Sequence, residues 1–132
     1  MPEVFRQAGV LPLLEGRLCL VTSSSGRRWV IPKGMIDPGH NAGEAALIEA
    51  WEEAGLVGTL VREPLGTYLY EKYGRKYYVI VYVLHVSEIA TDWPERSLRQ
   101  REWVELDEAL ERLEETGLRN LVNSALRVAA DV

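Results

Sequence analysis

The sequence predicts an α+β or α/β/α layered domain. Groups of strand-like segments alternate with helix-like segments along the chain, one strand-like segment is apolar on both faces, and one helix carries a face of small residues suited to packing on a sheet. The 132 residues are 47% hydrophobic and 27% charged, which is the composition of a globular protein. Their number corresponds to about one domain, so we expect a single domain over residues 1–132.

Strand patterns dominate the N-terminal part of the chain. The first strand is expected to break near Gly9 and Pro12, and the polar residues 23–28 predict the turn of a hairpin between the next two strands. Residues 32–40 hold two prolines and two glycines and are expected to be loop. The expected strands are residues 4–14, 17–22 and 29–31.

The first clear helix is expected over residues 41–54. Asn41 can cap its N-terminus, and Glu44 three residues later completes a capping-box pattern. Gly55 is expected to end the helix, because glycine adopts the left-handed conformation common at helix C-termini. A face of mostly small residues at helical spacing is expected in the core: Ala46, Leu47, Ala50 and Ala54.

The second half of the chain predicts three strands and two helices. Residues 77–84 are apolar on both faces and are expected at the centre of the sheet, next to a turn at Tyr73–Gly74. Asp107 is expected to cap one helix, and Gly117 to separate it from the last. The expected strands are residues 59–70, 76–86 and 101–106, and the expected helices are residues 107–115 and 118–130. The last helix is expected to point Leu121, Val122, Ala125 and Val128 inward.

Charge and composition exclude several classes of partner. The net charge of −5 and the pI of about 5.1 argue against a nucleic-acid polymer or an anionic membrane. No apolar run approaches the ~20 residues of a spanning helix, and the start does not have the pattern of a signal peptide. The single cysteine, Cys19, excludes an intrachain disulfide. We therefore expect a cytoplasmic protein whose anionic ligands must meet local positive charge or a metal ion.

Three carboxylates share one face of the helix expected over residues 41–54. At ~100° per residue, Glu49, Glu52 and Glu53 fall within an arc of about 100°, and this helix contains no lysine or arginine. Such a cluster is either a solvated acidic face, the commoner outcome, or a set of hard oxygen ligands for Mg²⁺ or Mn²⁺. Gly34 in the preceding loop favours the metal site, because its backbone can approach an ion closely.

The segment GMIDPGHNAGEAALIEAWEEAGL, residues 34–56, resembles a Nudix box. The pattern of that box is G-x5-E-x7-R-E-U-x-E-E-x-G-U, where U is a bulky aliphatic residue, and Ala50 is only a small substitute for the first U. Two positions depart: His40 stands where the family has glutamate, and Ile48 stands where it has arginine. In the family these two residues are thought to brace the loop against the helix. The matching positions are Gly34, Glu49, Glu52, Glu53, Gly55 and Leu56.

Further segments are similar to diphosphoinositol polyphosphate phosphohydrolases and related dinucleoside polyphosphate hydrolases. The resemblance implies the Nudix fold, a mixed β-sheet sandwiched between α-helices. It also implies a Mg²⁺-dependent enzyme, with Mn²⁺ as the other candidate ion, that hydrolyses a diphosphate linkage in a polyphosphorylated small molecule. A non-catalytic Nudix-fold binding or regulatory module with a degenerate box is the alternative, and a homodimer stays open. The similar segments are residues 28–34, 53–58, 75–76, 92–93 and 101–103.

The resemblance implies roles for individual residues. Glu49 and Glu53 are the expected metal ligands, together with the backbone carbonyl of Lys33, and Glu52 is the expected general base towards the attacking water. The roles of the three glutamates vary among family members, so an exchange between them stays open. Positive residues near the box, with the box glycine, are expected to bind the phosphates. These candidates are Arg27, Arg28, Lys33, Gly34, Arg75 and Lys76.

Overall fold

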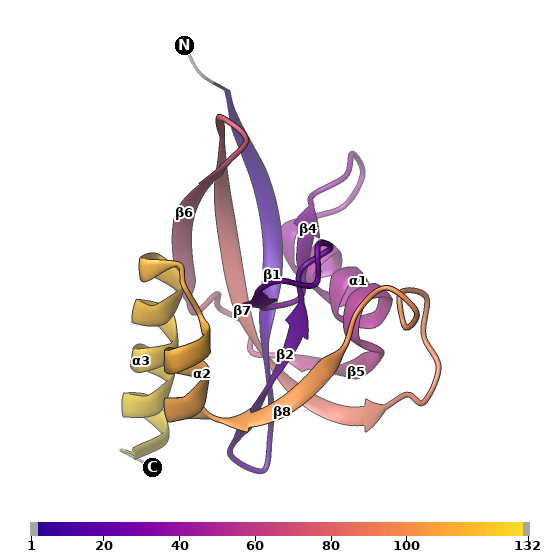
Figure 1. The fold of residues 1–132 in the computed structure, drawn as a ribbon, viewed down its shortest axis with the longest axis vertical. Coiled ribbons are helices and arrows are strands. Elements are labelled where there is room, and N and C mark those ends of the chain that lie inside the picture. Colours follow the sequence, from indigo (N-terminus) through magenta and orange to yellow (C-terminus); the bar gives the residue numbers. More distant parts are fainter. Residues whose placement is uncertain (1–2, 131–132) are drawn as a thin grey trace.

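The computed structural model describes residues 3–130, with side chains described as far as residue 125 (Figure 1). Within these residues an eight-stranded mixed sheet lies between α1 on one side and α2 and α3 on the other, so the predicted fold class is confirmed. The strands are β1 Val4–Leu14, β2 Arg17–Thr22, β3 Trp29–Val30, β4 Lys33–Met35, β5 Leu56–Leu60, β6 Gly66–Lys72, β7 Arg75–Ile89 and β8 Arg101–Glu105. The helices are α1 Ala42–Ala54, α2 Leu106–Arg112 and α3 Thr116–Ala130.

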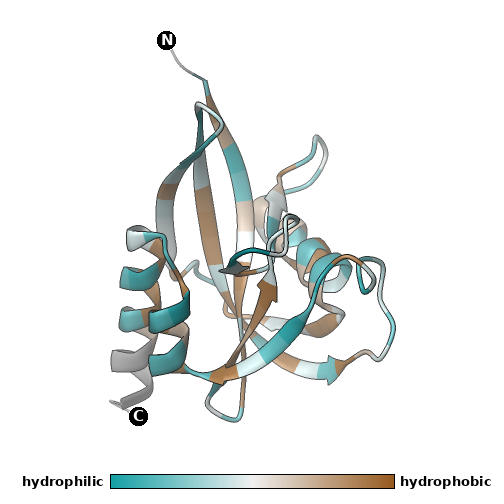
Figure 2. Ribbon diagram, viewed as in Figure 1, coloured by the Kyte–Doolittle hydropathy of each residue, from teal (hydrophilic) through white to brown (hydrophobic). Residues whose placement is uncertain are grey.

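Strands β1 and β7 form the centre of the sheet. They pair in parallel from Val4↔Lys76 to Leu13↔His85, while β7 also pairs antiparallel with β5 and β6, and β1 with β2 and β4. The central position predicted for residues 77–84 is therefore confirmed. Hydrophobic residues concentrate along strands such as β2, and hydrophilic residues on the outer faces of the helices (Figure 2).

Two hydrophobic cores lie on opposite faces of the sheet, because side chains alternate along each strand. Ala8 and Val10 of β1 pack under α1, whereas Leu11 of the same strand faces α2 and α3. Cys19 lies in the α1 core and is fully buried. None of the helices described, up to residue 130, is long and apolar enough to cross a membrane.

Helix α1 begins and ends as predicted. The Asn41 side chain accepts the Glu44 N–H at 2.8 Å, the Glu44 carboxylate accepts the Asn41 N–H at 2.9 Å, and Gly55 is left-handed with φ 65°. The alanines of the predicted core face are buried. Leu47 is not: it lies at the margin of the packed face and 40% of it is exposed, so that part of the prediction was wrong.

Three local predictions along the strands are corrected by long-range pairing. β1 runs unbroken through Gly9 and Pro12, because the absence of a side chain at Gly9 leaves room for the Pro32 carbonyl and the Lys33 Cβ, where the chain enters β4. Residues 33–35 are therefore a short strand, pairing with residues 7–9 of β1, and not loop. Residues 59–70 are not one strand: β5 ends at Leu60 and β6 begins at Gly66, and both pair with β7.

The C-terminal helices also start differently from the prediction. Glu105, not Asp107, is the N-cap residue of α2, and Asp107 accepts the Glu108 N–H instead. Gly117 lies inside the first turn of α3, where a Cβ would come within 2.6 Å of the Tyr68 Cβ, so the glycine permits close packing on the sheet. Val122 and Ala125 are buried and Leu121 packs against the core, as predicted, whereas the side chain of Val128 lies outside the described residues.

Candidate active site

The C-terminal half of α1 places two carboxylates against the backbone of β4. Glu53 is 6% exposed, and its Oε1 accepts the backbone N–H of Lys33 at 3.2 Å. The Glu49 carboxyl lies within hydrogen-bonding reach of the Glu53 carboxyl and directly against Gly34, where a Cβ would collide with it. The i, i+4 spacing on α1 thus brings Glu49 and Glu53 together, and Gly34 of β4 leaves room for the Glu49 carboxyl.

Burial gives these two carboxyls unusual electrostatics. Desolvation raises the pKa of Glu53 to about 8, with the Arg99 charge opposing and the Glu49 charge adding to the shift. The pKa of Glu49 is also raised, by burial first and by the Glu52 charge second. Adjacent carboxylates of this kind are stabilised in their ionised form by a cation between them, so the donor set fits a hard divalent ion.

Glu52 differs from the buried Glu53 in its exposure. It is partly exposed, and its backbone carbonyl accepts the Glu95 N–H at 3.0 Å. Among the described residues no group of three His, Cys, Asp or Glu side chains converges as a complete metal site. Two protein carboxylates are sufficient for Mg²⁺, which commonly completes its octahedral shell with water and substrate phosphate oxygens.

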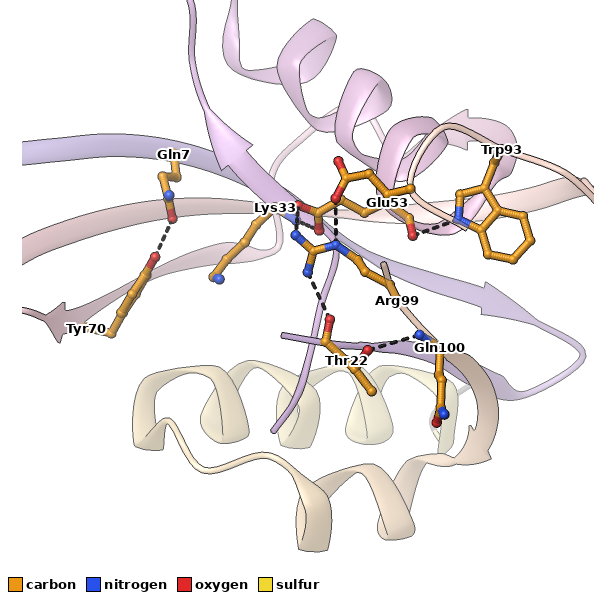
Figure 3. A network of polar contacts seen from close by, with 9 residues as sticks. Gln7, Thr22, Lys33, Glu53, Tyr70, Trp93, Arg99 and Gln100 are labelled. Carbon is orange, nitrogen blue, oxygen red and sulfur yellow. Dashed lines mark hydrogen bonds and ion pairs between the residues drawn. The ribbon is translucent and has the colours of Figure 1, made fainter. Parts of the chain in front are cut away.

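A guanidinium from a distant segment reaches the same carboxylate. Arg99 Nη2 lies 3.2 Å from Glu53 Oε2, while Nε donates to Glu95 Oε1 at 2.8 Å and Nη1 to the Thr22 carbonyl at 2.9 Å. Figure 3 shows the contacts of Arg99 with Glu53 and Thr22, and the Trp93 indole N–H, which donates to the Glu53 carbonyl at 3.0 Å. Arg99 therefore places a positive partner, fixed by its other contacts, against the buried Glu53 carboxyl from the segment before β8.

A cleft of about 180 Å³ opens beside Glu53. Four of its lining side chains are cationic and Glu53 is its one carboxylate among the described residues, so the cleft suits an anionic ligand. Lys33 is held 5.0 Å above the Tyr70 ring, and burial lowers its pKa. Tyr70 donates to Gln7 Oε1 at 2.8 Å, which orients the amide at the cleft wall. The lining residues are Gln7, Ser23, Ser24, Arg28, Val30, Lys33, Glu53, Tyr70, Lys72, Tyr77 and Arg99.

Comparison with known families identifies this arrangement. The sequence profile of the NUDIX domain matches residues 5–125. The chain belongs to the Nudix family. Its Nudix box, residues 34–56, runs from β4 through α1 to the start of β5, so the box contains both Gly34 and the carboxylate pair. Nudix hydrolases generally use divalent metals such as Mg²⁺, which agrees with the donor set on α1.

Individual relatives are similar over most of this chain but are longer. The chain is 39% identical over 103 residues to diphosphoinositol polyphosphate phosphohydrolase 2 of Homo sapiens, covering 76% of this chain and 56% of that protein. It is 38% identical over 99 residues to Nudix hydrolase 4 of Arabidopsis thaliana, covering 72% of this chain and 46% of that protein. The chain thus spans about half the length of the curated relatives it matches.

Solved structures share the fold of this Nudix chain. A C. elegans Ap4A hydrolase superposes with a TM-score of 0.75 at 25% identity, covering 94% of this chain and 98% of that one. A MutT protein from Methanosarcina mazei Go1 superposes with a TM-score of 0.71 at 20% identity, covering 97% and 96%. These similarities confirm the mixed sheet between helices as the Nudix fold.

The structure brings together only part of the expected phosphate-binding set. Arg28 and Lys33 line the cleft, and Gly34 lies against Glu49. Arg27 is exposed in the turn between β2 and β3, and it does not line the cleft as the described residues form it. Arg75 instead lies 5.4 Å from the centre of the Phe5 ring, and Lys76 pairs with Glu71 at 4.0 Å, both away from the lining.

Two cations of the cleft were missed by sequence reasoning. Lys72 lies just before the Tyr73–Gly74 turn, so the basic character of that turn pointed to the region but not to this residue. Arg99 had no local signal at all, because it lies 46 residues from Glu53 in an irregular segment. Only the packing of residues 90–101 on the end of α1 brings it to the site.

Proposed function

We propose that this chain is a metal-dependent pyrophosphohydrolase that cleaves a diphosphate linkage in a polyphosphorylated small molecule. The observation that carries the proposal is the Glu49–Glu53 carboxyl pair set against β4, in which Glu53 is buried and lines a cleft that also holds four cationic side chains. A binding site of this charge suits a ligand with several phosphates, and the carboxylate pair suits the divalent ion that the family uses. Membership of the Nudix family and the names of the relatives support the same chemistry.

Each group has a defined task in this proposal. Glu49 and Glu53 hold Mg²⁺, or Mn²⁺ in its place, and the backbone carbonyl oxygen of Lys33 is a further ligand of the ion. When bound, the ion would neutralise phosphate charge and polarise the phosphoryl oxygens. Glu52 accepts the proton of the attacking water, and its partial exposure leaves it accessible to solvent. Arg28 and Lys72 bind the remaining phosphates through charge-assisted hydrogen bonds.

The cleft favours a phosphate-dense substrate over one with a nucleobase. Tyr70 and Tyr77 are the aromatic residues of the lining, and their rings are stacked on each other with centroids 4.8 Å apart. Tyr70 also carries the Lys33 ammonium near its ring, and Tyr77 packs on Phe5 with centroids 5.6 Å apart. Little aromatic surface is left for a base to stack on, so a diphosphoinositol polyphosphate is the preferred class and a diadenosine polyphosphate the second.

A substrate panel tests the proposal. Phosphate release from a diphosphoinositol polyphosphate, a diadenosine polyphosphate and a nucleoside diphosphate derivative is measured with Mg²⁺ and with a chelator. We expect Mg²⁺-dependent release, highest for the first class, and its loss in Glu53→Gln. Glu102→Gln is the control, because Glu102 is an exposed acid on β8 that pairs with Arg112 at 3.1 Å outside the cleft.

The departures at His40 and Ile48 favour one competing function, that of a non-catalytic Nudix-fold binding module. In that case no member of the panel is hydrolysed, while a polyphosphorylated ligand still raises the Tm of the protein. This result would contradict the proposed activity and support the binding module.

A further inference from the structure

The C-terminal end of α1 is held by one external segment, residues 90–101. The last four carbonyls of a helix have no partner within the helix and are usually left to caps or solvent. Here the carbonyls of residues 52–54 and of the cap residue Gly55 each accept a hydrogen bond from residues 90–101, so four hydrogen bonds hold the end of the helix that carries Glu52 and Glu53. The four carbonyls and their donors are Glu52 with Glu95 N at 3.0 Å, Glu53 with Trp93 Nε1 at 3.0 Å, Ala54 with Arg101 Nη1 at 2.7 Å and Gly55 with Ala90 N at 2.9 Å.

Arg99 extends this support from the backbone to the Glu53 carboxylate. All three nitrogens of its guanidinium are used, one on Glu53, one on Glu95 and one on the Thr22 carbonyl of β2. The Arg99 side chain is only 14% exposed, so its orientation is set by three fixed partners rather than by solvent. Glu53 is therefore anchored through both oxygens, Oε1 by the Lys33 N–H and Oε2 by Arg99 (Figure 3).

The Nudix box of this chain does not itself supply a guanidinium. Position 48, where the box pattern has arginine, is isoleucine, and α1 contains no basic residue at any position. Among the described residues, Arg99 is the arginine that forms an ion pair with Glu53, and it comes from outside the box. The orientation of Glu53 thus depends on a segment that the box pattern does not include.

We propose that Arg99 is a positioning residue, which fixes Glu53 in the geometry needed to hold the divalent ion. The inference rests on the proposed function. Partners that orient a metal-ligating side chain typically contribute 10- to 100-fold to metal affinity. Three of its five N–H donors are engaged by the protein, one of them on Glu53, so the contacts of Arg99 in the structure are to the ligand, whereas Arg28 and Lys72 line the same cleft without contacting Glu53.

Mn²⁺ binding to the substrate-free protein, followed by electron paramagnetic resonance, tests this role directly. We expect Arg99→Ala to weaken Mn²⁺ binding about 10- to 100-fold. Arg99→Lys is expected to restore part of it, because a lysine keeps the charge but can replace only part of the forked contact. Arg96→Ala is the matched control: Arg96 lies in the same segment but is exposed and pairs with exposed Asp92, at 3.8 Å, so wild-type binding is expected.

Kinetics separate positioning from the two other roles that an arginine at this place can have. A positioning role predicts that Arg99→Ala lowers kcat and leaves KM within about twofold. A raised KM with unchanged Mn²⁺ affinity would mean phosphate binding, and a lower Tm with unchanged Mn²⁺ affinity would mean a structural role only; either result overturns the inference. Unchanged or tighter Mn²⁺ binding at wild-type Tm would also overturn it, since Arg99 would then only neutralise Glu53 in the metal-free protein.

Glu53→Gln distinguishes failure of the inference from failure of the proposed function. If the wild-type protein binds Mn²⁺, Glu53→Gln loses that binding and Arg99→Ala retains it, the metal site stands and the positioning role of Arg99 is wrong. If Glu53→Gln binds Mn²⁺ as the wild type does, or the wild type binds none, the proposed metal site is wrong and the inference falls with it.

Discussion

Replacing Gly34 by alanine is expected to lower the activity strongly while leaving the stability of the fold nearly unchanged. A Cβ at Gly34 would lie closer to the Glu49 carboxyl than a Cβ normally comes to another heavy atom, with even the more distant oxygen, Oε2, at 2.7 Å. The backbone at Gly34 is not left-handed, so alanine itself is tolerated there. The strain is relieved when the end of the flexible Glu49 side chain moves, and the metal ligand moves with it.

The size of the effect follows from this geometry. Ordinary contact begins at 3.4 Å, so the Glu49 carboxyl must retreat by roughly 1 Å, a displacement that costs on the order of 100-fold in rate when it affects groups at the reacting centre. The free energy of unfolding is expected to change by less than about 1 kcal/mol, because one rotamer adjusts and no packed backbone moves. Mg²⁺-dependent phosphate release and urea denaturation measure the two quantities.

Gly43→Ala is the matched control for Gly34→Ala. Its Cβ would meet its nearest neighbours, Asn41 Oδ1 and Leu60 Cδ1, at 3.5 Å, which is ordinary contact. Because alanine is favoured over glycine in helices by up to about 1 kcal/mol, this variant is expected to be fully active and equally or more stable. Wild-type activity in Gly34→Ala, or a loss of stability above about 3 kcal/mol, would refute the reasoning.

Three further predictions concern catalysis, substrate binding and pH. Glu52→Gln or Glu53→Gln is expected to lower kcat by several orders of magnitude while far-ultraviolet circular dichroism stays native. Arg28→Ala and Lys72→Ala are each expected to raise KM for a polyphosphorylated substrate about tenfold, the value of one charge-assisted hydrogen bond. Burial raises the pKa of Cys19 from 9.0 to about 12, so the folded state keeps the thiol protonated while the unfolded state ionises. The free energy of unfolding is therefore expected to fall as pH rises above 9, by about 1 kcal/mol at pH 10 from this group.

Each of these predictions has its own control. Near-wild-type activity in both glutamine variants would remove the roles assigned to the glutamates. Lys76→Ala should leave KM unchanged, because Lys76 pairs with Glu71 outside the cleft, and an equal rise in KM would show that the general charge of the protein, not the cleft, is measured. Cys19→Ala should reduce the loss of stability between pH 8 and pH 10, and an unchanged slope would assign that loss to other groups.

Local structure was predicted well wherever neighbouring residues determine it. The capping box at Asn41 and the left-handed Gly55 depend on residues within one turn of the helix ends, and both were found. The turn at Tyr73–Gly74 was found for the same reason: both residues adopt positive φ, of 52° and 74°. Residues 33–35 were missed because their strand conformation depends on pairing with β1, which their own polarity and glycine content do not indicate.

In the candidate site, too, the features set by neighbouring residues were predicted and those set by long-range packing were not. Glu49, Glu52 and Glu53 share a helix face because the helix period places them there, and the motif that contains them is continuous in sequence. Their different surroundings were not predictable: Glu53 is buried while Glu52 is partly exposed, because burial depends on what packs against α1. The same holds for the basic residues, of which Arg28 lines the cleft and its neighbour Arg27 does not.

By itself the sequence determined the fold class, the Nudix box and the carboxylate face of α1, since helix periodicity and capping act over a few residues. Only the tertiary structure decided that residues 90–101 cap the end of α1, that Arg99 meets Glu53, and that Arg28, Lys33 and Lys72 line one cleft. These contacts join segments tens of residues apart, and their geometry follows from how the segments pack on the sheet, which no local pattern encodes.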